Sequence, residues 1–209
     1  MFTAYATATR SASLSRQVGG AAFDEYGDVI AVGYNDVAKA KGGLYNCESK
    51  NDRRDRAEGG DSNDVIKNEI GEELLNVVKE NVKGEVNVEA LRKAIKQTTI
   101  KSLTEFGRDV HAEMEVICSA ARQGRSLRDA TLYITTFPCH NCAKHIVASG
   151  IKEVVFVEPY PKSQALRLFS DSIGVEFGSN DKVLFSPFYG VSARRYLDLF
   201  SMKEGSGAR

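Results

Sequence analysis

Two short motifs constrain this chain more than any other feature: His-Ala-Glu at residues 111–113 and Pro-Cys-His-Asn-Cys at residues 138–142. Cys139 and Cys142 can present two thiolates from one helical turn, and His111 can add an imidazole. Three such ligands without a fourth match a catalytic Zn²⁺ site, which keeps one coordination position open; a structural site closes with four protein ligands. The motifs therefore predict a zinc enzyme in which Glu113 moves protons and is not a ligand.

Other interpretations of the two cysteines are a buried pair of thiols or half of a zinc knuckle. The upstream histidine and glutamate, and a proline at the expected start of a helix, favour the catalytic site. His140 and His145 are expected at the surface or behind the ligands, and Cys118 on the packed face of its helix. Cys47 lies in a loop and is a candidate for a spare ligand.

The charge and the cysteine content limit which binding partners and which cellular compartment are expected. The chain has 209 residues and a formal net charge of +0, with 42% apolar and 27% charged residues, as in an ordinary globular protein. The balanced charge argues against long DNA or RNA as the main ligand, because such binding depends on clustered cations. Cysteines in a metal motif, without a signal peptide or a membrane-spanning run, predict a reducing, cytoplasmic location.

Hydrophobic periodicity predicts a single domain over residues 1–209. Apolar runs at 17–23 and 29–35, around a glycine-containing turn, predict a β-hairpin. Helical spacing predicts the two helices that carry the motifs, at 110–123 and 139–149. Further strands are expected at 132–137, 154–157 and 175–177, and further helices at 3–16, 163–172 and 192–200. This order favours a mixed sheet with helices on both faces and with the motif helices starting at adjacent strand ends.

A region at about 44–105 interrupts this pattern. It contains a charge run at 51–56 and helical spacing at 62–83 and from 88 toward 103. We expect an insertion that packs on the core or covers the pocket, because it is small for a separate domain. Its apolar faces favour a homo-oligomer. Residues 201–209 are expected to be a flexible tail.

Residues 15–35 and 110–160 resemble the deoxycytidylate deaminases, a family within the cytidine deaminase superfamily. H-x-E followed by P-C-x-x-C is the signature of zinc-dependent nucleobase deaminases. The resemblance implies a three-layer α/β/α fold with a mixed five-stranded sheet, Zn²⁺ on His111, Cys139 and Cys142, and Glu113 as the proton shuttle. The reaction implied is attack at C4 of a cytosine ring. The matching blocks are Arg16-Gln17-Val18-Gly19, Gly33-Tyr34-Asn35, 111–113, 137–144 and 150–154.

The resemblance also implies residues around the substrate. Asn35 is expected to contact the sugar or the base, although its place after a strand is also typical of a turn residue. Ala112 and Pro138 are expected beside the substrate, and Tyr160 is expected to cover the base or to bind phosphate. Arginine and lysine suit phosphate groups, although each taken singly is usually a surface charge. The candidates are Arg53, Arg54, Lys162, Arg167, Arg194 and Arg195.

Residues 52–55, 61–63, 187–191 and 194–196 are similar to the deaminase domain of bacterial anti-phage deoxycytidine nucleotide deaminases. That resemblance implies conversion of dCTP and dCMP to dUTP and dUMP, which starves a phage of a precursor. The same resemblance, and no other feature of the sequence, implies a regulatory RNA as a partner. That family usually carries an N-terminal P-loop domain, whereas this sequence has no G-x-x-x-x-G-K-[ST] pattern.

Three other functions compete with this prediction. The first is a housekeeping dCMP deaminase of pyrimidine metabolism. The second is a deaminase of single-stranded DNA or RNA, which should need a positive groove with stacking aromatics; the balanced charge and the absence of Trp argue against it. The third is a nucleotide-binding module without turnover, and Glu113 argues against it because binding needs no proton shuttle.

Overall fold

The computed structural model describes residues 1–175, 178 and 181–201. The chain divides into two compact units. We call Met1–Asp36 with Val110–Arg209 the core unit, and Val37–Asp109 the insertion unit. The predicted insertion at 44–105 falls inside the insertion unit. Two short strands, β3 (Asp36–Val37) and β4 (Asp109–Val110), pair where the chain passes from one unit to the other.

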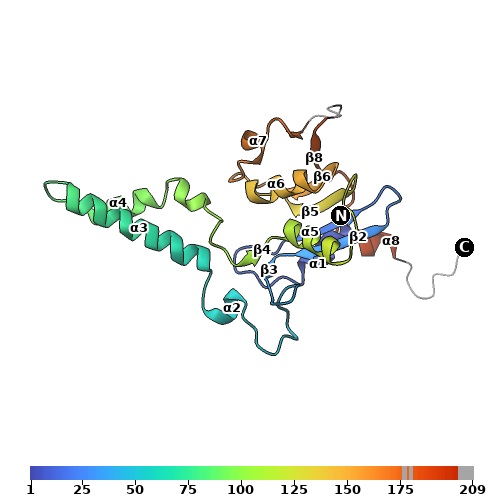
Figure 1. Cartoon of the computed structure of the whole chain (residues 1–209), viewed down its shortest axis with the longest axis horizontal. Helices are drawn as coiled ribbons and strands as arrows, with labels where there is room; N and C mark the ends of the chain where they lie inside the picture. The colour runs from blue at the N-terminus through green and yellow to red at the C-terminus, as the bar shows by residue number, and fades with distance from the viewer. Residues whose placement is uncertain (176–177, 179–180, 202–209) are drawn as a thin grey trace, which may run out of the picture. The chain divides into compact units, whose positions relative to one another are not determined.

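The core unit is built on a six-stranded mixed sheet with the strand order β2-β1-β5-β6-β8-β7 (Figure 1). β1 and β2 form the predicted antiparallel hairpin, with Gly19 opposite Tyr34. β1 also pairs antiparallel with β5, whereas β5, β6, β8 and β7 run parallel. The strand bounds are β1 Gly19–Phe23, β2 Val29–Tyr34, β5 Thr131–Thr136, β6 Glu153–Glu158, β7 Ile173–Gly174 and β8 Val183–Pro187.

The sheet has one strand more than the five predicted. The strand missed is β8, because its apolar run, Val183–Phe185, is short and stands close to Pro187. In the fold β8 lies between β6 and β7, parallel to both, and Phe185 is fully buried. A strand is expected at 175–177, but β7 ends at Gly174 and Val175 is not part of it; residues 176 and 177 lie outside the described residues.

Two glycines on β1 show how helices cover the faces of this sheet. A Cβ at Gly19 would overlap the backbone of α1 (Phe2–Ala8), whereas a Cβ at Gly20 would meet Val116 in α5 (Ala112–Arg122). Because successive residues of a strand point to opposite faces, α1 and α5 cover opposite faces. α6 (His140–Ala148) packs beside α5. The predicted three-layer α/β/α fold is confirmed.

Three helices of the core unit are shorter than predicted. α1 ends at Ala8, not near residue 16, because the following backbone bonds to distant side chains: Ala12 N donates to Asp36 Oδ2 at 3.1 Å. α7 (Ala165–Leu168) stops where Phe169 leaves the helical conformation, with φ −124° and ψ 37°. α8 (Tyr196–Phe200) covers only the second half of the helix predicted at 192–200.

The insertion unit is helical. Its elements are α2 (Asp55–Glu58), α3 (Ser62–Asn81), α4 (Val88–Ile95) and the 3-10 helix η1 (Thr99–Ser102). α3 begins where Asp61 accepts a hydrogen bond from Asn63 N at 2.8 Å, as expected of a helix N-cap. It ends two residues before the predicted residue 83, because Val82 is extended with φ −100° and ψ 122°.

Residues 202–209, most of the predicted flexible tail, lie outside the described residues. No helix in the described part of the chain has the length and hydrophobicity needed to cross a bilayer.

Candidate metal centre

The two motif helices begin at their metal-ligand candidates. His111 precedes α5 in an extended conformation, with φ −65° and ψ 153°, so it occupies the N-cap position. Cys139 occupies the same position in α6, where its Sγ accepts a hydrogen bond from Cys142 N at 3.4 Å. Because α5 and α6 pack together, their N-terminal residues can meet although they are far apart in the sequence.

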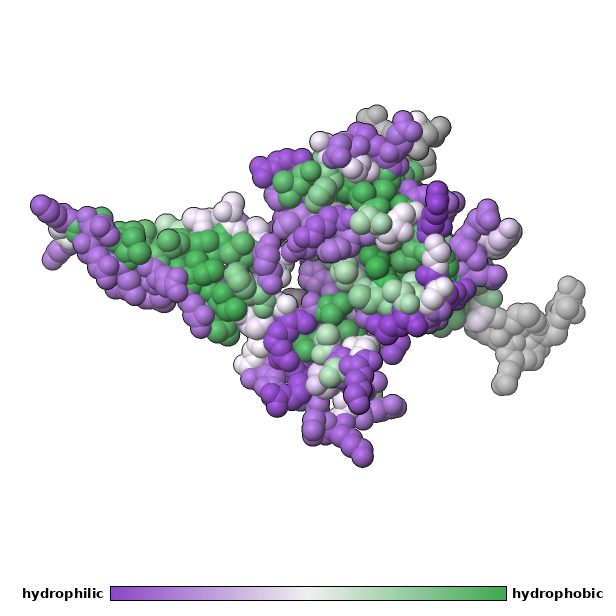
Figure 2. Space-filling view, viewed as in Figure 1, coloured by the Kyte–Doolittle hydropathy of each residue, from purple (hydrophilic) through white to green (hydrophobic). Residues whose placement is uncertain are grey.

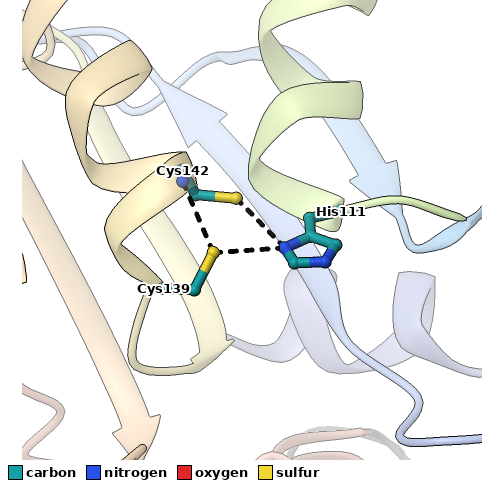
Figure 3. A group of neighbouring side chains, drawn as sticks. All are labelled: His111, Cys139 and Cys142. Atoms are coloured by element: carbon teal, nitrogen blue, oxygen red, sulfur yellow. Dashed lines mark hydrogen bonds between the residues drawn. The ribbon is translucent and has the colours of Figure 1, made fainter. Parts of the chain in front are cut away.

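Three ligand atoms converge at this point (Figure 3). His111 Nδ1 lies 3.4 Å from Cys139 Sγ and 3.3 Å from Cys142 Sγ, and all three atoms lie within 4.8 Å of one another. Tetrahedral zinc, with Zn–S bonds of about 2.3 Å and a Zn–N bond of about 2.0 Å, separates nitrogen and sulfur by roughly 3.5 Å. The cluster therefore fits the predicted zinc ion.

The two thiols differ in acidity. A hydrogen bond from Cys142 lowers the pKa of the Cys139 thiol to about 4, against the opposing effect of burial. The same bond, together with burial, raises the pKa of the Cys142 thiol above its usual value. The pair thus shares one proton between two sulfurs, and a thiolate is the form of cysteine that binds metal.

Glu113 lies beside this cluster without belonging to it. The residue is 4% exposed, and burial raises the pKa of its carboxyl to about 7, although His111 acts in the opposite direction. The carboxyl also bonds to the Cys142 thiol, and this contact contributes to the raised pKa of that thiol. A buried carboxyl that exchanges a proton near neutral pH beside a metal site has the properties of a general acid and base.

Comparison with known families agrees with this geometry. Residues 1–158 match the family model described as the cytidine and deoxycytidylate deaminase zinc-binding region. This chain belongs to the cytidine and deoxycytidylate deaminase family. All three ligand candidates of this family member, His111, Cys139 and Cys142, lie inside the matched region and fit a zinc site.

Several named proteins are similar to this family member. Deoxycytidylate deaminase of Enterobacteria phage T4 is 48% identical over 56 residues, which are 27% of this chain and 29% of the phage protein. Human deoxycytidylate deaminase is 35% identical over 78 residues, which are 35% of this chain and 43% of the human protein. The chain thus spans less than half the length of these relatives.

A solved structure shares the fold at low sequence identity. It is the dCMP deaminase from the cyanophage S-TIM5 in complex with dCMP and dUMP. The TM-score is 0.51 at 16% identity, and the match covers 89% of this chain and 91% of that chain. At that identity the likeness supports the cytidine-deaminase-like fold alone.

Asn35 is held by the backbone of the segment that precedes β1. Its Oδ1 accepts a hydrogen bond from Val18 N at 2.7 Å, and its Nδ2 donates to Arg16 O at 2.8 Å. The residue is 6% exposed. In this deaminase-family chain, Asn35 therefore fixes the conformation of residues 16–18. Contact with the sugar or the base stays a prediction, since each amide group has a further bonding position.

The Tyr160 hydroxyl is affected by the charge of a metal-ligand candidate and by the charge of Arg16, which was not among the predicted phosphate ligands. Burial raises the pKa of the Tyr160 hydroxyl, the charge of Cys139 raises it further, and Arg16 lowers it. Both charged side chains thus lie close enough to act on one hydroxyl. Arg16 Nη1 also pairs with Glu158 Oε2 at 3.3 Å. The one sequence signal for Arg16 was its place in a block that resembles the family.

Pro138 and Ala112 are buried, and each is the sequence neighbour of a metal-ligand candidate. Pro138 is less than 2% exposed, and its carbonyl accepts a hydrogen bond from Ser163 Oγ at 2.7 Å. Ala112 is fully buried at the start of α5, where its carbonyl faces Gly33. Ser163 thereby ties the segment before Cys139 to the loop before α7. No sequence motif marked Ser163.

The predicted phosphate ligands of the core unit lie in different places. Lys162 is exposed in the turn after β6, and Arg167 is exposed on α7. Arg194 Nε donates to Tyr5 Oη at 2.6 Å, on the helix that covers the sheet face opposite α5. The neighbouring Arg195 lies 3.8 Å from an acidic side chain of α8. The structure does not bring Arg194 to the ligands, and the role of these cations in binding phosphate stays a prediction.

Arg53 and Arg54 belong to the insertion unit. Arg53 Nε pairs with Glu58 Oε1 at 2.6 Å, and Arg54 Nη2 pairs with Asp52 Oδ2 at 2.6 Å. Arg54 is 6% exposed. Their predicted role in binding phosphate stays a prediction as well.

The remaining histidines and cysteines do not join the cluster in the described part of the chain. Cys47 is exposed in the insertion unit, and Cys118 is partly buried in α5. His140 and His145 belong to α6, and His145 is exposed. The described residues therefore offer three protein ligands, as expected for a site that leaves one position open.

Proposed function

We propose that the chain catalyses the hydrolytic deamination of deoxycytidine nucleotides, with dCMP as the first substrate. The observation that carries this proposal is the convergence of three zinc-ligand atoms next to the buried carboxyl of Glu113. The names of similar proteins support the choice of substrate. The similar proteins of phage T4 and human are named deoxycytidylate deaminase. The structure of the cyanophage dCMP deaminase was solved in complex with dCMP and dUMP.

The side chains of the site provide the proton transfers. His111, Cys139 and Cys142 would hold a zinc ion, which would supply a water molecule activated for attack at neutral pH. Glu113 accepts the proton released by water, because its buried carboxyl titrates near neutral pH. The same carboxyl then protonates the ring nitrogen and assists the departure of ammonia. One water and one deoxycytidine nucleotide give one deoxyuridine nucleotide and one ammonia.

The proposal extends to dCTP as a second substrate and to depletion of deoxycytidine nucleotides during phage infection. This extension rests on the resemblance of residues 52–55, 61–63, 187–191 and 194–196 to anti-phage deaminases. We also propose that the enzyme is homo-oligomeric and cytoplasmic. The alternative is a housekeeping dCMP deaminase. Turnover of dCTP favours the anti-phage role, and turnover of dCMP alone favours the housekeeping role.

Ammonia release from zinc-loaded protein tests the proposal. The substrates to compare at equal concentration are dCMP, dCTP, deoxycytidine, CTP and cytosine-containing single-stranded DNA. We expect turnover of dCMP and dCTP to exceed that of deoxycytidine and CTP by roughly 100-fold, because unmade polar contacts strongly penalise the wrong substrate. Turnover of the single-stranded DNA, without turnover of any free nucleotide, would contradict the proposal.

Arg16→Gln is expected to raise KM for dCMP by at least about tenfold, because a hydrogen bond to a charged group contributes about 1.5–3 kcal/mol. We choose Arg16 because its charge acts on the same Tyr160 hydroxyl as the charge of the ligand residue Cys139. Inhibition by dUMP should weaken by the same factor, whereas inhibition by deoxyuridine, which lacks the phosphate, should not change.

Arg128→Gln is the matched control, because Arg128 is exposed and pairs with Asp129 before the start of β5, whereas Cys139 follows the end of that strand. That variant should leave both inhibition constants unchanged. If Arg16→Gln weakens dUMP and deoxyuridine equally, Arg16 orients the base or the sugar and does not bind the phosphate.

A further inference from the structure

The insertion unit has few buried apolar side chains for its length. It comprises Val37–Asp109, all of which the structure describes. Its buried apolar residues are Val37, Leu44, Leu75 and Ile95. A unit of this size normally depends on a contiguous hydrophobic core, since a small chain buries a small share of its surface. The insertion unit therefore needs a further surface against which it can bury apolar side chains.

α3 and α4 form a helical hairpin that uses only part of its apolar surface. Leu75 is fully buried and Ile95 is 9% exposed, and Ile95 Cγ2 lies 3.8 Å from the Cβ position of Gly71. Arg92 of α4 donates to Glu72 of α3 at 2.8 Å, across the seam where the two helices meet. These contacts define the side of α3 that faces α4.

A second apolar stripe lies next to this seam on α3. At 100° per residue, Ile66, Ile70, Leu74 and Val77 fall within about 80° of one another around the helix. Leu74 is 41% exposed and Val77 is 55% exposed. Figure 2 shows hydrophobic side chains gathered along both helices of the hairpin. We call Ile66, Ile70, Leu74 and Val77, with Leu91 and Ala94 of α4, the hairpin face.

The two sides of the hairpin carry opposite charge. α3 has five carboxylates and two lysines, a net charge of −3, whereas residues 88–101 have one carboxylate and four basic residues, a net charge of +3. By the same helical spacing, Glu73 and Glu80 border the hairpin face on the α3 side, and Lys93 lies on the outer side of α4. We call the side with Glu73 and Glu80 the acidic edge and the side with Lys93 the basic edge. The two edges flank one apolar face.

We propose that the hairpin face binds the same face of a second copy of this chain. A two-fold axis parallel to the helices places α3 of each copy opposite α4 of the other, antiparallel, in a four-helix arrangement. This brings each acidic edge against a basic edge. The other two-fold arrangement, with α3 opposite α3, would bring carboxylates together and is disfavoured. The proposal does not depend on the deaminase reaction.

The molar mass of the full, zinc-loaded chain, measured by light scattering or sedimentation, tests the proposal. We expect the wild-type assembly to have at least twice the chain mass of 22.9 kDa. Leu74→Glu with Val77→Glu should halve the mass of the assembly, with helix content by circular dichroism unchanged. Val65→Glu is the control: Val65 is 52% exposed on the same helix, outside the hairpin face, and its replacement should leave the mass unchanged.

Charge exchange identifies the partner. Glu73→Lys with Glu80→Lys in one protein, and Lys93→Glu in another, should each weaken self-association by about tenfold, because like charges then meet. Mixing the two proteins, or combining the changes in one chain, should restore association. A monomeric wild type, or a mass that the Leu74 and Val77 changes leave intact, would overturn the proposal and assign the face to the core unit or to a different protein.

Discussion

Glu113→Gln is expected to lower kcat by roughly 10⁴-fold, the upper range for loss of a general acid and base, and to leave the zinc content unchanged. Glutamine has nearly the shape of glutamate but cannot accept or deliver a proton. The carboxyl lies beside the Cys142 thiol and outside the group of three ligand atoms, so its loss should not open the metal site. Ammonia release and zinc analysis on the same preparation check both parts.

Glu115→Gln provides the matched control on the same helix. Glu115 is also buried, at 7% exposed, but it accepts a hydrogen bond from Arg122 at 2.6 Å. Its replacement should cost about 1–3 kcal/mol of stability, because a charged hydrogen bond is lost, and should change kcat by less than about tenfold. If Glu113→Gln loses zinc together with activity, the carboxyl is a ligand and the proposed division of roles is wrong.

Gly33→Ala is expected to destabilise the fold by about 3 kcal/mol, the upper range for overpacking a core, and to lower the melting temperature by roughly 10 °C. A Cβ at Gly33 would lie 2.5 Å from the carbonyl oxygen of Ala112 and 2.6 Å from Val116 N. These are backbone atoms of α5, so the strand and the helix must move apart. Because His111 is the N-cap residue of α5, zinc affinity should fall as well.

Gly71→Ala tests whether that effect is specific to the contact between β2 and α5. Gly71 lies inside α3, and the nearest atom to its Cβ position is Ile95 Cγ2 at 3.8 Å. Alanine should therefore fit and stabilise α3 by about 0.5–1 kcal/mol, the usual gain inside a helix. Thermal unfolding should show shifts of opposite sign for the two variants, and zinc titration should show weaker binding for Gly33→Ala alone. Equal stability of Gly33→Ala and the wild type would refute the close-packing argument.

The short-range features of this protein followed from sequence because they depend on spacing along the chain. Cys139 and Cys142 are three residues apart, so one helical turn brings both sulfurs to one side, and the helix period makes that outcome independent of the rest of the fold. The β1–β2 hairpin is likewise local, since its strands are joined by one short turn. The family resemblance of residues 15–35 and 110–160 added the three-layer fold and the pairing of His111 with these cysteines.

Other features were decided by contacts between residues far apart in sequence. β8 is a strand because β6 and β7 supply hydrogen bonds on both of its sides. Its short apolar run does not predict these partners. Asn35 bonds to the backbone of Arg16 and Val18, and the charge of Arg16 acts on the Tyr160 hydroxyl, through the packing of segments that no local pattern relates. The sequence by itself determined the ligand set and the helices that present it. Tertiary packing decided which further side chains surround the ligands, because burial and long-range contacts exist only in the folded chain.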